Sequence, residues 1–185
     1  LILAAVVAGL GGAAYYFGQE RKALQSEAFV GGPLIAGIET RINDVDHMRL
    51  ESQEGGVLNL DRTADGWTIQ EQHGYRANPE RVTELLKRVA TLTTVEPKTS
   101  KPENHARLNL DDPAGENALG TRITLKDGDA TVADLVVGLN RPEPQGGGAF
   151  VRLWDDDQTW LTEQDFKPKR RTLDLIDRNV VNVDG

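Results

Sequence analysis

The chain has 185 residues, of which 27% are charged and 38% hydrophobic, with a formal net charge of −8 and no cysteine. An acidic chain is a poor candidate for nucleic-acid binding, which needs a clustered basic surface. The absence of cysteine excludes disulfides, thiolate metal sites and cysteine nucleophiles. The length fits one ordinary domain, or one domain with appendages.

The first 18 residues, LILAAVVAGLGGAAYYFG, carry no charge. A bilayer core needs about 20 apolar residues in a helix, and aromatic residues favour its interface. We therefore interpret residues 1–18 as a transmembrane anchor, truncated at its start because the chain begins with Leu1. A cleaved signal peptide and a buried core helix are the alternatives. Residues 19–33, polar and then rich in glycine and proline, are expected to form a juxtamembrane linker.

Alternating patterns predict a β-meander over residues 47–52, 57–62 and 67–72, after a short amphipathic helix that begins near residue 34. Asn78 and Pro79 suit the start of a helix, and apolar residues then recur at helical spacing to Leu92. We expect this helix to cover the apolar face of the meander.

A second meander is predicted after a proline-containing connection over residues 95–113, in which residues 103–108 suit a short helical turn. Its strands are expected at residues 121–126, 131–137, 149–154 and 158–162, followed by a helix over 173–180. The predicted fold is α+β, with two antiparallel meanders each packed with a helix. This soluble domain spans residues 34–185 and is expected to continue beyond Gly185, where the sequence ends abruptly.

Residues that carry chemistry show no pattern typical of an active site. The histidines His47, His73 and His105 lack the convergent spacing of a zinc site. No serine lies in a nucleophile elbow, and the glycine run at 146–148 lacks the residues of a phosphate loop. We therefore predict no catalytic residue, no metal and no cofactor.

Two other groups of side chains are candidates for binding. If the meanders face one another, Trp67, Tyr75, Trp154 and Trp160 could line a ligand or partner groove; core packing is the simpler interpretation. The basic cluster consists of Lys167, Lys169, Arg170 and Arg171. It could contact lipid headgroups or an acidic partner, or be a solvated loop.

Residues 33–113 contain several short motifs that occur together: an Asn-Asp-Val triplet, Asp-Gly-Trp at a turn, Glu-Pro-Lys-Thr, and Pro-Glu three residues later. With them the chain resembles the bacterial family called domain of unknown function 4340. Asn109 stands where the family usually has Gly, and Asn78 where it usually has Asp. The matching residues are Asn43, Asp44, Val45, Arg62, Asp65, Gly66, Trp67, Tyr75, Ala77, Leu85, Leu86, Glu96, Pro97, Lys98, Thr99, Pro102, Glu103, Leu108, Asp112 and Pro113.

The resemblance implies a protein anchored in the bacterial inner membrane by one N-terminal helix, with its domain in the periplasm. Some members are similar to auxiliary components of ABC-type transport systems of the gliding-motility kind. The resulting hypothesis is a non-enzymatic accessory or scaffolding component, with the membrane and ABC permease subunits as partners. A polysaccharide- or ligand-binding module of the envelope is the alternative, and a hydrolase is a remote one.

Overall fold

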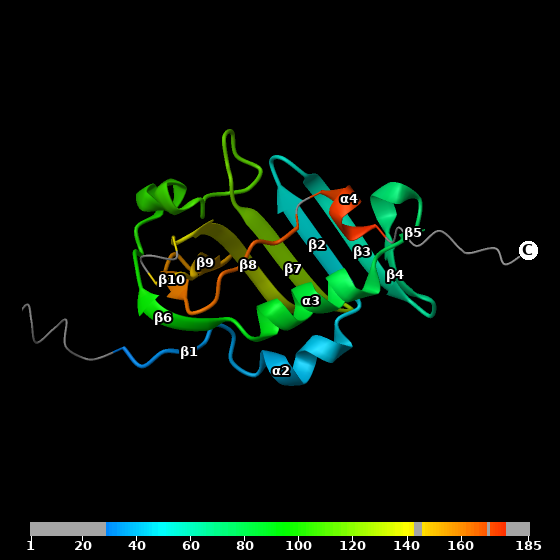
Figure 1. The fold of residues 1–185 in the computed structure, drawn as a ribbon, viewed down its shortest axis with the longest axis horizontal. Coiled ribbons are helices and arrows are strands. Elements are labelled where there is room, and N and C mark those ends of the chain that lie inside the picture. The colour runs from blue at the N-terminus through cyan, green and yellow to red at the C-terminus, as the bar shows by residue number, and fades with distance from the viewer. Residues whose placement is uncertain (1–28, 143–145, 170, 177–185) are drawn as a thin grey trace, which may run out of the picture. The chain divides into compact units, whose positions relative to one another are not determined.

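One antiparallel sheet organises the chain in a computed structural model, which describes residues 29–142, 146–169 and 171–176. Within these ranges ten strands pair in the order β1-β6-β10-β9-β8-β7-β2-β3-β4-β5 (Figure 1). The strands are β1 (Gly32–Pro33), β2 (His47–Ser52), β3 (Gly56–Thr63), β4 (Gly66–Ile69), β5 (Tyr75–Arg76), β6 (Thr93–Pro97), β7 (Thr121–Asp127), β8 (Ala130–Asn140), β9 (Ala149–Leu153) and β10 (Thr159–Thr162).

Helices are few and short in the same part of the chain. The only α-helix longer than two turns there is α3 (Pro79–Ala90). The others are α2 (Ile38–Arg41), α4 (Thr172–Leu175) and the 3₁₀ segments η1 (Ile42–Asp44), η2 (Gln70–Gln72) and η3 (Pro102–Leu108).

The predicted α+β fold with two separate meanders is wrong, because β2 and β7 join both meanders into a single, mostly β structure. Leu50 pairs with Ile123, and Arg49 with Thr124, along this antiparallel junction. The pairing partners are more than 70 residues apart in sequence. The alternating pattern of each strand fits the edge of a separate meander equally well, so it does not indicate that the two strands pair. The second meander has no long helix of its own among the described residues.

The predicted final helix is also shorter than expected where the structure describes it. Helix α4 ends at Leu175, because Ile176 forms an antiparallel bridge with Ala77 instead of continuing the helix. Residues 177–180 of that predicted helix lie outside the described residues.

The predicted transmembrane anchor, residues 1–18, lies outside the described residues too. Among the residues that the structure describes, no helix is long and apolar enough to cross a membrane. The compact unit begins at Gly31, and Gly32 and Pro33, in the stretch predicted as a linker, form β1 against β6.

Helix α3 covers one face of the sheet, and the chain that follows β10 crosses the same face to reach α4 (Figure 1). Asn78 caps the helix, its Oδ1 accepting hydrogen bonds from the backbone N–H groups of Glu80 and Arg81 at 3.0 and 3.1 Å. The buried side of α3 presents Val82, Leu85 and Val89 to the core. The main core of the protein therefore lies between this face of the sheet, α3 and the C-terminal crossing.

The opposite face of the sheet divides into two parts. On β2, the half-buried His47, Arg49 and Glu51 alternate with buried residues of the core face. Near β8 and β9, by contrast, η3 and the residues after it cover the sheet, since Arg152 donates a hydrogen bond to the Leu110 carbonyl. A polar open area thus lies beside a covered area on one face.

Candidate functional site

The four aromatic residues proposed to line a groove do not come together. Trp67 in β4 and Trp160 in β10 both pack against the main core, and five strands separate β4 from β10 in the sheet. Tyr75 is 49% exposed on the terminal strand β5. Trp154 follows β9 and stacks against the guanidinium of Arg122.

The stack of Arg122 on Trp154 lies on the open face and is held in place by further contacts. The guanidinium carbon of Arg122 lies 3.5 Å from the ring centroid. Arg122 also donates two hydrogen bonds to Asp134, Nε to Oδ1 at 2.8 Å and Nη2 to Oδ2 at 2.7 Å. These hydrogen bonds raise the pKa of Arg122. A cation already held by a bidentate carboxylate therefore occupies one face of Trp154.

The three histidines lie on separate elements. His47 in β2 contacts Asp61 in β3, with Nδ1 and Oδ1 2.6 Å apart. His73 ends η2 in the left-handed region, and His105 is buried in η3 with Nε2 2.9 Å from the Asp157 carbonyl oxygen. Within the described ranges no three His, Asp or Glu side chains form a group that could hold a metal ion.

Asp61 makes the stability of the fold depend on pH. Burial raises the pKa of Asp61, but the hydrogen bonds with Gln70 and His47 outweigh it, so the pKa is lowered overall. A carboxyl whose pKa is lower in the folded state stabilises the fold above its unfolded pKa of about 3.9, and loses that effect as the pH falls.

We expect Asp61→Asn to lower the free energy of unfolding by about 0.5 kcal/mol at pH 7, because its side chain is 39% exposed and screened by solvent. At an acidic pH at which the wild-type carboxyl is protonated in the folded as well as the unfolded state, the two proteins should approach equal stability. Urea unfolding at both pH values measures this. A gap that stays constant would show that the charge of Asp61 does not matter.

A hollow of about 470 Å³ lies on the covered side of the sheet, between η3 and the end of β6 with the residues that follow it. We call it the η3 hollow. This volume is within the range of small-molecule sites. Its described lining residues come from three segments and combine apolar with polar groups. They are Glu96, Pro97, Lys98, Thr99, Asn104, Arg107, Leu108 and Phe150.

The wall formed by η3 follows from its local sequence. Pro102 occupies the first turn, where its missing N–H is harmless. A 3₁₀ helix has three residues per turn, so Asn104 and Arg107 lie on the same side and face the hollow. His105 is 5% exposed and turns inward to the Asp157 carbonyl, which fixes the segment on the domain.

The opposite wall is an extended strand end. The N–H of Lys98 donates to the Thr159 carbonyl at 2.8 Å, and the N–H of Thr99 donates to the Thr159 hydroxyl at 2.9 Å. Phe150 lies in the same cross-strand row, since both it and Glu96 pair with Leu161 of β10. The sheet thus supplies a rigid floor with one aromatic ring.

Some charged side chains of the η3 hollow have partners of opposite charge, and one does not. Lys98 and Glu96 form an ion pair at 2.5 Å, and Arg141 lies 3.9 Å from the same carboxylate. Arg107 has no ion pair or hydrogen bond to its side chain from any described residue, and it is exposed. The hollow can therefore accept a carboxylate or another acidic group at Arg107, with an apolar portion against Phe150 and Leu108.

Residues 67–185 match the family model described as Domain of unknown function (DUF4340). The chain belongs to this family. No curated protein and no solved structure matches the chain. The resemblance inferred from the short motifs is thus confirmed at family level, and five of the residues that carry it line the η3 hollow: Glu96, Pro97, Lys98, Thr99 and Leu108.

Sequence reasoning missed Arg107 as a site residue. The signal was present, because a helical turn was expected at residues 103–108, and Asn104 and Arg107 are three residues apart in it. The sequence does not show that this turn lies opposite the Glu-Pro-Lys-Thr stretch. That arrangement depends on long-range contacts, such as the one between His105 and the Asp157 carbonyl.

Proposed function

We propose that this chain is a non-enzymatic, membrane-anchored protein of the bacterial envelope, an accessory or scaffolding component of an ABC-type transport or gliding-motility-like system. Its domain is extracytoplasmic in this proposal, and its partner is a permease subunit. The uncharged segment over residues 1–18 supports the anchor. The family resemblance supports the association with ABC-type systems.

The η3 hollow is the observation that carries the proposed contact. It has two walls from distant parts of the chain, a floor on the sheet, and an unpaired cation, Arg107, beside the aromatic Phe150. Aromatic residues, phenylalanine among them, and arginine are both enriched at protein–protein interfaces. An acidic side chain of the permease, carried on an extracytoplasmic loop, fits this site.

The test compares full-length proteins purified from their native membrane in mild detergent, with mass spectrometry of the proteins that copurify. Arg107→Glu places a carboxylate against the acidic partner and should reduce recovery of the permease at least tenfold. Lys101→Glu makes the same charge change on an exposed residue that does not line the hollow. This control should recover the permease like the wild type.

Two results would contradict the proposal in different ways. Recovery of the wild-type protein without any ABC permease or ATPase would remove the accessory role itself. Equal recovery of the permease by the wild type and Arg107→Glu would keep that role but exclude the η3 hollow as the contact.

The polysaccharide-binding and hydrolase alternatives gain no supporting observation. The first depended on the aromatic groove, whose four residues lie apart. For the second, neither Ser52 nor Ser100 has a histidine among its hydrogen-bond partners in the described part of the chain.

A further inference from the structure

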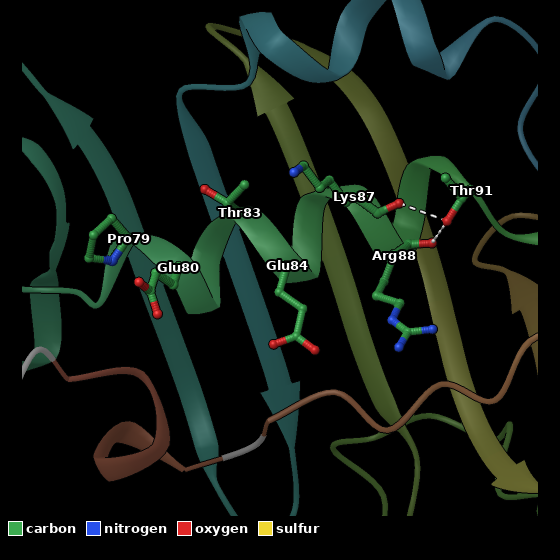
Figure 2. A pocket seen from close by; sticks show the side chains of 7 residues that line it. All are labelled: Pro79, Glu80, Thr83, Glu84, Lys87, Arg88 and Thr91. Carbon is green, nitrogen blue, oxygen red and sulfur yellow. Dashed lines mark hydrogen bonds between the residues drawn. The ribbon is translucent and has the colours of Figure 1, made fainter.

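Helix α3 and the chain after β10 enclose a second, smaller space, which we call the α3 groove. Figure 2 shows that Glu84 and Arg88 point from α3 toward this following segment, whereas Thr83 and Lys87 point to the other side of the helix. The described residues that line the groove are Arg81, Glu84, Leu85, Arg88, Asp165, Phe166, Lys167, Pro168, Lys169 and Leu175.

The larger hollow along α3 in Figure 2, of about 660 Å³, is different. All its described lining residues belong to α3 or to Thr91, which caps the end of that helix. It has no opposing wall among the described residues, so it is the polar side of an amphipathic helix rather than a cleft. The α3 groove, by contrast, has a wall from each of two segments.

The basic cluster predicted from sequence forms part of the second wall. Phe166 and Pro168 are buried, while Lys167 and Lys169 are exposed. This alternation is typical of extended chain, and it places both lysines on the same side. Arg170 lies outside the described residues, and Arg171 is 3.7 Å from Asp174.

The cations of the α3 groove exceed the carboxylates available to them. Glu84 is 3.5 Å from Arg81, and Asp165 accepts a hydrogen bond from the N–H of Gly148 at 2.6 Å. Among the described residues, no ion pair or hydrogen bond involves the side chains of Arg88, Lys167 and Lys169. Three unpaired cations thus gather in a protein whose net charge is −8.

The floor of the groove increases the effect of these charges. Leu85, Phe166 and Leu175 are 5%, 5% and 1% exposed. An apolar floor lowers the local dielectric and strengthens the attraction of an anion to the cations at the rim. Repulsion among the cations falls when such an anion binds.

The volume of the groove limits the ligand to a single group. It is about 90 Å³, well below the roughly 300–1,000 Å³ of ordinary small-molecule sites. A phosphate group is compact, carries nearly two negative charges at neutral pH, and accepts hydrogen bonds from both arginine and lysine. A carboxylate has only one negative charge and two oxygens, so it matches three cations less well than a phosphate group does.

We propose that the α3 groove binds a phosphate group through Arg88, Lys167 and Lys169, either on the headgroup of an anionic lipid or as a free phosphate. This site is independent of the η3 hollow and of the ABC-type role. It gives the basic cluster a function that does not depend on a protein partner.

The test uses the full chain in mild detergent with two probes, inorganic phosphate and mixed micelles that contain phosphatidic acid. Isothermal titration calorimetry measures binding of each, and micelles of phosphatidylcholine alone are the reference. Arg88→Gln should weaken binding of the effective probe about tenfold. Lys87→Gln removes one charge from the neighbouring position, points away from the groove, and should leave the affinity within twofold of wild type.

Each outcome decides the proposal. Binding of inorganic phosphate that Arg88→Gln weakens identifies a free-phosphate site, while the same dependence with phosphatidic acid alone identifies a lipid headgroup. Binding of neither probe by the wild type overturns the proposal. Equal weakening by Arg88→Gln and Lys87→Gln also overturns it, because it would indicate diffuse attraction; unchanged unfolding temperatures confirm that both variants are folded.

Discussion

Replacing Arg152 with Met is expected to lower the free energy of unfolding by about 3 kcal/mol, because one buried and one half-buried carbonyl group lose a charged donor. Arg152 in β9 is 7% exposed. Its Nε donates to the Leu110 carbonyl at 3.1 Å, and its Nη1 donates to the Trp154 carbonyl at 2.8 Å. Burial lowers the pKa of Arg152, yet a guanidinium stays protonated in proteins.

This substitution differs from the replacement of a buried ion pair by apolar residues, which is often neutral or stabilising. There both charged partners are removed together. Here the acceptors are backbone carbonyls, of Leu110 and Trp154, and they remain in place after the change. Met fills a similar volume but donates nothing, so the desolvation cost of the carbonyls is no longer compensated.

Urea unfolding at pH 7 measures the effect, and Arg49→Met is the matched control. Arg49 lies on the open face with a side chain 39% exposed and 3.3 Å from Glu51, so its loss should cost less than about 1 kcal/mol. If Arg152→Met proves as stable as Arg49→Met, the Leu110 and Trp154 carbonyls do not depend on the guanidinium.

Local sequence patterns predicted most individual strands, because alternation and turn residues are local signals. Residues 47–52 form β2 as expected, and Asn78 and Pro79 begin α3. The expected strand over residues 67–72 was too long, since β4 ends at Ile69 and η2 follows. Polar residues at 70–72 fit a solvated turn as well as an edge strand.

The assembly of these elements could not be predicted in the same way. The contact of β2 with β7 is made by the backbone edges of two strands. The side-chain pattern of a strand does not indicate which other strand its edge pairs with. The binding sites share this dependence on long-range contacts. The basic cluster was visible in sequence, but its position opposite Arg88 requires the chain after β10 to return across the sheet alongside α3.

Glycines at close backbone approaches are a further feature that only the fold explains. In β8, a Cβ on Gly138 would meet the Leu108 carbonyl oxygen well inside van der Waals contact, and would lie 2.9 Å from the Asn109 carbonyl oxygen. These neighbours are backbone atoms, which cannot turn away as a flexible side chain can. The absence of a side chain at Gly138 therefore lets the end of η3 lie directly on the sheet.

Gly138→Ala is accordingly expected to lower the free energy of unfolding by about 2–3 kcal/mol, because η3 must shift off β8 to admit the methyl group. Urea unfolding measures the loss. Gly32→Ala is the matched control, since a Cβ there meets nothing within 4 Å, and it should be neutral or slightly stabilising. Equal stability of the two variants would mean that the segment at Leu108 yields without cost.

The double variant of Gly138→Ala and Arg152→Met extends this test to the η3 hollow. Both changes act on one stretch, because a Cβ at Gly138 would meet the carbonyl of Leu108, and Arg152 donates a hydrogen bond to that of Leu110. Residues that share a partner are coupled. Once Gly138→Ala has displaced this stretch, the hydrogen bond from Arg152 to it is already weakened, so Arg152→Met removes less stability. The double variant should therefore lose less free energy of unfolding than the sum of the two single losses. Strict additivity would indicate that β8 and β9 hold η3 independently.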